Sequence, residues 1–155
     1  MKKWLAILPV MVLCSMARAD ADALNGINTV RVVVEVSPEL KRADPALSDH
    51  VEADACIGIR NTGARVVEDS PENAAVPVLS ISITGQVRNG LVSYFYSVRL
   101  RQLAKTTLTG TLTEATTWEN TGGGMGMERQ VTLIRGFVGD TVEQFINKLQ
   151  SANQR

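Results

Sequence analysis

The sequence predicts an α+β fold: a largely antiparallel sheet of four to five strands, covered on one face by two helices in the order β-α-β-β-β-β-α. Three observations lead to this prediction. Several runs alternate apolar and polar residues, as half-buried strands do. Two segments carry apolar residues at helical spacing, and turn residues separate the segments. The 155 residues are 45% hydrophobic and 21% charged, which suits one small domain with its own core.

Residues 1–19 have the pattern of a cleaved signal peptide. Two lysines precede residues 4–16, which are apolar but too few to span a bilayer at about 20 residues. The Ala17-Arg18-Ala19 run then offers small residues for cleavage after Ala19. Residues 20–155 are therefore expected to form a single α+β domain that is periplasmic or secreted.

Export is expected to leave a mildly acidic domain with one cysteine. The predicted leader holds three of the 16 basic residues and none of the 16 acidic ones. This charge argues against nucleic acid and against an anionic membrane surface as partners, and no integral membrane segment is expected after cleavage. Cys14 follows Leu13, where a lipidation signal has a small residue, so no lipid anchor is expected. Cys56, opposite Leu47 and Val51 on its helix, is a candidate for an intermolecular disulfide.

The elements follow from local patterns. Asp44 and Pro45 predict the start of a helix that runs to about Thr62, because aspartate caps free amides and proline has none to lose. Asn89-Gly90 predicts a tight hairpin. Strands are predicted at residues 28–36, 64–68, 78–87, 91–103 and 107–118. The apolar stripe of the first helix is Leu47, Val51, Ala55 and Gly58, flanked by Ile57 and Ile59. A last helix over residues 127–151 has the apolar seam Met127, Val131, Ile134, Val138, Val142, Phe145 and Leu149.

A glycine run separates the third strand of the meander from the last helix. Gly122, Gly123, Gly124 and Met125 are predicted to form a flexible loop, because glycine adds positive φ and little order. The run precedes a helix, as a phosphate-binding loop does, but it lacks the Gly-Lys-Ser/Thr ending. The sequence therefore does not predict a phosphate site.

The whole pattern carries a resemblance. A Leu24-Asn25-Gly26-Ile27 entry, a β-branched strand, a helix closing in Gly63-Ala64-Arg65-Val66-Val67, a meander and a final helix resemble uncharacterised secreted bacterial envelope proteins. At fold level the pattern is similar to the amino-terminal domain of the Tol-system propeller protein and to the lipoprotein activators of penicillin-binding proteins. The resemblance implies recognition of other envelope proteins, and it brings no catalytic motif.

No reactive cluster is visible, so no enzyme and no cofactor are predicted. His50 and Cys56 lie about 240° apart on one helix and cannot touch. One histidine and one mature cysteine cannot close a zinc site without two carboxylates, and no metal site is predicted. Asp54 points toward the core stripe and needs a partner, for which Arg31 and Arg65 are the candidates.

Recognition through a surface is the remaining function. Leu133 and Phe137 lie away from the seam of the last helix, with Gly136 beside them, and are predicted to bind a partner. The expected function is an exported envelope-assembly or protein-interaction module without catalytic activity, whose partner is an envelope protein or a second copy of itself. Docking through the last helix or through a free sheet edge is the expected mechanism. A small apolar ligand or lipid carrier is the alternative, and a hydrolase with a carboxylate site is a weaker one.

Overall fold

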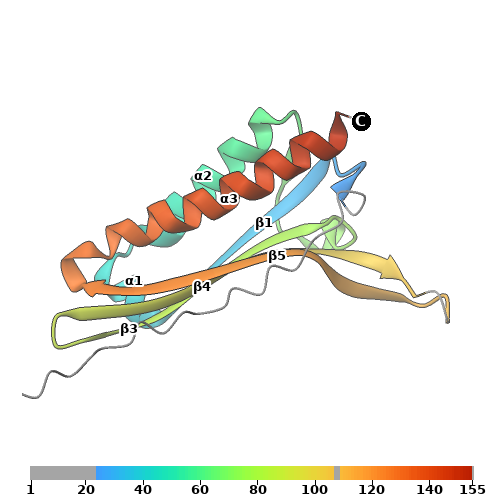
Figure 1. The fold of residues 1–155 in the computed structure, drawn as a ribbon. Coiled ribbons are helices and arrows are strands. Elements are labelled where there is room, and N and C mark those ends of the chain that lie inside the picture. The colour runs from blue at the N-terminus through green and yellow to red at the C-terminus, as the bar shows by residue number, and fades with distance from the viewer. Residues whose placement is uncertain (1–23, 107–108, 155) are drawn as a thin grey trace, which may run out of the picture.

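A computed structural model describes residues 24–106 and 109–154 (Figure 1). The elements are β1 (Thr29–Val36), α1 (Pro38–Ala43), α2 (Leu47–Asn61), β2 (Arg65–Val67), β3 (Val78–Arg88), β4 (Leu91–Lys105), β5 (Leu112–Met127) and α3 (Thr132–Asn153). Short 3-10 turns lie at Pro71–Asn73 and Glu128–Gln130. The α+β class and the order of strands along the chain are as the sequence predicts.

The strands form one mixed sheet in the order β2-β1-β3-β4-β5. The strand β1 runs parallel to β2 and β3, while β3, β4 and β5 form an antiparallel meander. At the predicted hairpin, Asn89 and Gly90 have φ of 52° and 74°, as a tight turn requires. The strands β3 and β4 continue past the end of β1, so the hairpin between them extends beyond β1 (Figure 1).

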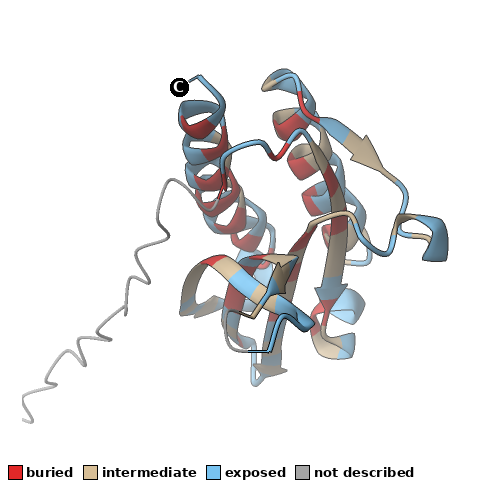
Figure 2. Cartoon of the chain, turned by 90° about the vertical axis from the view of Figure 1, so that its right-hand side faces the viewer, coloured by how far each residue is buried: buried red, intermediate tan, exposed pale blue. Residues whose placement is uncertain are grey.

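The helices α2 and α3 lie side by side on one face of the sheet (Figure 1), and Figure 2 shows buried residues gathered between the two layers. The predicted seam of α3 is confirmed from Val131 to Leu149, whereas Met127 is half-exposed in β5. In α2 the buried residues are Leu47, Val51, Ala55 and Ile59, and Ile57 is exposed. From the sheet, β-branched and leucine side chains complete the core at Val30, Val32, Leu79, Ile81, Ile83, Val98 and Leu100.

The single helix predicted over residues 44–62 is wrong at its start. The helix α2 begins at Leu47 rather than at Pro45, and a separate short helix, α1, precedes it over Pro38–Ala43. The carboxylate of Asp44 accepts a hydrogen bond from the amide of Ala46 at 3.1 Å. Asp44 therefore does satisfy a free amide beside α2, as predicted, but α1 forms ahead of it because Pro38 can begin a helix.

The flexible loop predicted at Gly122, Gly123, Gly124 and Met125 is also wrong. All four residues belong to β5, which continues to Met127 and pairs with β4 along its length. Of the strand predicted over residues 107–118, residues 107–108 lie outside the described residues. No helix in the described part of the chain is both long enough and apolar enough to cross a membrane.

Candidate functional site

A row of stacked aromatic rings lies where α3 crosses β4 and β5. The rings of Tyr96 and Tyr94 are 6.5 Å apart between centroids, and those of Tyr94 and Phe137 are 6.2 Å apart. The hydroxyl of Tyr96 shares a hydrogen bond of 3.2 Å with that of Thr141 on α3. The row therefore runs from the buried Tyr96 to the half-exposed Phe137, and burial raises the pKa of the Tyr94 hydroxyl.

The glycines of β5 are explained by these rings. Gly122 pairs with Tyr96 and Gly124 with Tyr94 in the sheet register. A β-carbon at Gly122 would overlap the hydroxyl of Tyr96, and one at Gly124 would lie 3.0 Å from that of Tyr94. Each tyrosine ring thus packs directly on the backbone of a glycine, and this contact stabilises the glycine run as a strand. This cover comes from the neighbouring strand, so the glycine run itself carried no signal of it.

Large apolar side chains surround this end of β5 on both faces. On the helix face, Leu133 is 52% exposed and Phe137 48%, beside Tyr94. On the opposite face, Met125 is 87% exposed and Met127 is half-exposed. We call these five residues the apolar rim. The predicted partner-binding residues Leu133 and Phe137 thus lie on the surface, and Gly136 beside them is exposed.

Among the described residues, β5 is the last strand of the sheet, and no other strand pairs with its outer edge. The amide of Glu128 donates to the carbonyl of Gly90 at 2.8 Å, and the amide of Met127 to Oε1 of Gln130 at 2.9 Å. Backbone groups alternate in direction along a strand. The amides and carbonyls of Gly123 and Met125 therefore point outward, on the edge that no strand in residues 24–106 and 109–154 covers.

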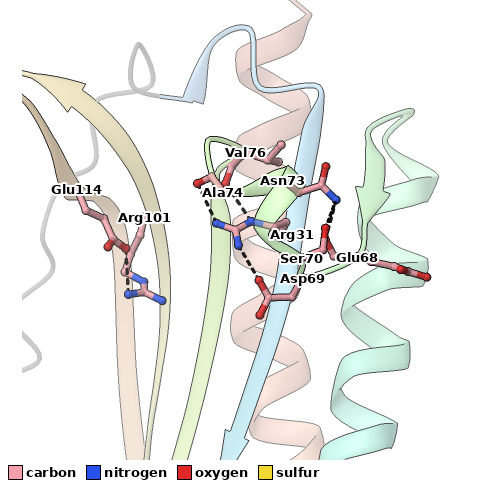
Figure 3. Close-up of polar contacts among 9 residues, drawn as sticks. All are labelled: Arg31, Glu68, Asp69, Ser70, Asn73, Ala74, Val76, Arg101 and Glu114. Atoms are coloured by element: carbon pink, nitrogen blue, oxygen red, sulfur yellow. Dashed lines mark hydrogen bonds and ion pairs between the residues drawn. The ribbon is translucent and has the colours of Figure 1, made fainter.

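A second candidate site is a polar trough on the open face of the sheet, lined by Arg31, Asp69, Arg101 and Glu114 at the other end from the apolar rim (Figure 3). Arg31 donates to Asp69 at 2.6 Å and to the carbonyls of Ala74 and Val76, and so fastens the loop after β2 to β1. Across the trough, Arg101 and Glu114 form an ion pair of 2.9 Å. In each of these two ion pairs the positive and negative charges neutralise each other, which indicates a structural role for the pair.

One polar atom in this trough has no partner. Nε of Arg101 is buried and makes no hydrogen bond among the described residues. Its own side chain is nonetheless held by Glu114 on the neighbouring strand. Because the atom is covered, a bound molecule would reach it only after the trough rearranged, so the trough is a weaker candidate than the apolar rim.

The carboxylates do not converge. Asp54 pairs with Arg135, and the predictions of Arg31 or Arg65 as its partner are wrong. The two hydrogen bonds, of 2.7 and 2.8 Å, join α2 to α3, and the bond from Arg135 lowers the pKa of Asp54. Among the described residues, no group of three or more histidine, cysteine, aspartate or glutamate side chains could hold a metal ion.

Cys56 is half-buried on α2 and packs against the core. The exposed thiol that the sequence suggested is therefore only partly accessible. Burial raises the pKa of this thiol, and nearby Glu52 adds to the effect. A disulfide through Cys56 stays a prediction, and the protonated thiol is the less reactive form.

A hollow of about 200 Å³ lies between α2 and α3. Small residues open it, among them Ala55, Gly58 and Gly139, and the Asp54–Arg135 pair stands at its rim. Ligand pockets usually have about 300–1,000 Å³. The hollow is therefore smaller than a site for a lipid.

No protein-family model and no curated protein matches the chain. Among solved structures, it is similar to a PelC dodecamer from Paraburkholderia phytofirmans, with 17% identity, 88% of this chain and 96% of that chain covered, and a TM-score of 0.51. It is also similar to a minor lipoprotein from Acinetobacter baumannii, with 13% identity, coverage of 82% and 93%, and a TM-score of 0.44. The first likeness shows a shared fold.

Proposed function

We propose that the chain is an exported, non-catalytic envelope module that acts by docking, and that its partner is a second copy of itself. The observation that carries the proposal is the apolar rim around the free edge of β5. Contiguous exposed apolar surface on a small domain is typical of an interaction site. The docking residues are Leu133 and Phe137 on α3, with Tyr94 beneath Phe137.

The arrangement of charges favours docking over hydrolysis. The carboxylate of Asp54 is paired with Arg135, and that of Asp69 is paired with Arg31, so the two belong to separate ion pairs. Acid–base catalysis needs groups that converge on one substrate. The lipid-carrier alternative is less favoured. The hollow between α2 and α3 is small, and the larger apolar hollow, of about 590 Å³ and lined by Leu91, Met125 and Met127, lies among exposed side chains at the surface rather than inside the fold.

One likeness supports self-association. The solved structure that shares the fold is described as a dodecamer, so self-association is a property of one protein with this architecture. The fold-level resemblance predicted from the sequence, to the Tol-system and penicillin-binding-protein activator domains, is part of the proposal and implies protein recognition in the envelope. Periplasmic or secreted location, after cleavage behind Ala19, is part of the proposal.

The test is the molar mass of the protein, purified from cells that express the full chain, measured by light scattering over a range of concentrations. The Leu133→Asp/Phe137→Asp double variant is expected to weaken self-association at least tenfold, because it places two charges in an apolar contact. Leu112→Asp is the matched control, since Leu112 is as exposed but lies at the far end of β5. A wild-type protein of single-chain mass at every concentration, or an unchanged double variant, would contradict the proposal.

A further inference from the structure

The second half of the β5 edge lacks the devices that protect exposed strands. Natural edge strands carry lysine, proline, inward charges or a bulge that prevents pairing with another chain. Residues 121–127 contain no charge and no proline, and the register between β4 and β5 is regular there. Exposed apolar side chains flank the same stretch on both faces. Such an edge is suited to accept a further strand.

We infer that this edge pairs with the same edge of a second copy, antiparallel and centred on Gly124. The inference rests on the proposed self-association and names its contact. The outward amide and carbonyl of Gly123 would bond with those of Met125 in the other copy, and the reverse, by two-fold symmetry. The side chain of Gln130 already occupies the amide of Met127, so the pairing ends there.

Side chains complement one another in this register. On the open face, Met125 of each copy lies opposite Gly123 of the other, so a large side chain meets an empty position. On the helix face, Gly124 lies opposite Gly124, and Gly126 opposite Gly122. No β-carbon projects there, which leaves room for Phe137 of both copies to meet across the seam between the two sheets.

Charge favours the same arrangement. The paired segments are uncharged, so two copies bring no like charges together at the centre. Before the paired stretch, Glu119 is already bound to Arg99 of its own copy at 2.7 Å, so its charge is neutralised there.

The experiment compares Met125→Pro with Met125→Ala. Both substitutions remove the exposed side chain, but only proline removes the outward amide, and it leaves the ladder to β4 intact. We expect Met125→Pro to raise the dissociation constant of the dimer at least tenfold relative to Met125→Ala, measured by light scattering. Circular dichroism establishes that both variants are folded.

Hydrogen exchange on the wild-type protein tests the same contact without a substitution. The amides of Gly123 and Met125 are expected to become protected as the concentration rises through the dimerisation range. Rapid exchange of both amides in a self-associated sample, or equal dimerisation of the two Met125 variants, would overturn the strand pairing while leaving docking through α3 intact. Protection at single-chain mass would mean that another segment of the same chain covers the edge, and would also overturn it. Failure of the wild-type protein to self-associate would instead remove the proposed function.

Discussion

The two halves of strand β5 share one edge and protect it differently. In the first half, Glu114 pairs with Arg101 across the ribbon, and the register shifts between Leu100 and Arg101. In the second half, residues 121–127 carry neither charge nor register shift. A charged, irregular edge resists further strands, whereas a regular and uncharged one invites them.

The difference shows how one strand can serve two purposes. The first half needs its charges because Leu103 and Leu112 are exposed near them. In the second half, glycines replace side chains on the helix face, and the rings of Tyr94 and Tyr96 take their place. The rings of Tyr94 and Tyr96 cover the glycines and hold this half as a strand. Because the glycines carry no side chains of their own, the outer edge of this half has nothing to block a further strand.

The largest effect is expected from Gly122→Val, which adds a branched side chain where Tyr96 lies over the backbone. The ring must move and its hydrogen bond to Thr141 is strained. Overpacking of this kind costs about 1–3 kcal/mol of unfolding free energy, measured by urea denaturation of the monomeric Leu133→Asp/Phe137→Asp variant.

The matched control is Thr113→Val in the first half of the strand, where the residue is exposed. We expect a change within about 0.5 kcal/mol there, as for most surface substitutions. An equal loss of stability in both variants would show that the two halves do not differ, and would remove the explanation of the glycine run.

A smaller effect is expected from Glu114→Leu, which removes a charge from the first half of β5 and so makes its edge more like the uncharged edge of the second half. Arg101 loses its ion-pair partner, and an apolar residue joins Leu103 and Leu112 on the exposed ribbon. We expect a several-fold increase in self-association, seen as higher mass by light scattering. Glu114→Gln removes the charge and adds no apolar surface, so it is expected to change the mass less. A Glu114→Leu protein that associates no more than wild type would mean that charge does not protect this edge.

Sequence reasoning predicted what local patterns encode. The seam of α3 from Val131 to Leu149 and the Asn89-Gly90 hairpin were predictable because periodicity and turn chemistry lie within a few residues. The exposed position of Leu133 and Phe137 followed from the same periodicity.

Two of the wrong predictions, the glycine loop and the partner of Asp54, were set by distant residues. Gly122 and Gly124 belong to a strand because of rings that another strand provides, and glycine alone indicated a loop. Asp54 pairs with Arg135, 81 positions along the chain, rather than with the predicted Arg31 or Arg65, which are nearer in sequence. Neither contact leaves a local pattern. The part of the candidate site on α3 was therefore predictable, and the part on β5 was not.

The smallest effect concerns pH, and it separates the stability of the fold from the contact at the edge. The hydrogen bond from Arg135 lowers the pKa of Asp54 in the folded state relative to the unfolded one. A lowered pKa stabilises the fold above the unfolded value, and this contribution is lost as the pH falls from about 5 through the folded pKa. Asp54→Asn is therefore expected to lower Tm slightly at pH 7, and the difference from the wild type is expected to shrink as the pH falls through the folded pKa. The pair is partly exposed, so the difference at pH 7 is small.

Glu52→Gln is the control, because Glu52 is exposed on the same helix beyond its first turn and makes no ion pair among the described residues. Its Tm is expected to follow that of the wild type throughout. Self-association of Asp54→Asn at pH 7 should also equal that of the wild type, since the ion pair joins α2 to α3 and contributes nothing to the β5 edge. A dimer weakened by Asp54→Asn would mean that the relative position of the two helices controls the contact, and the bare edge would no longer suffice to explain it.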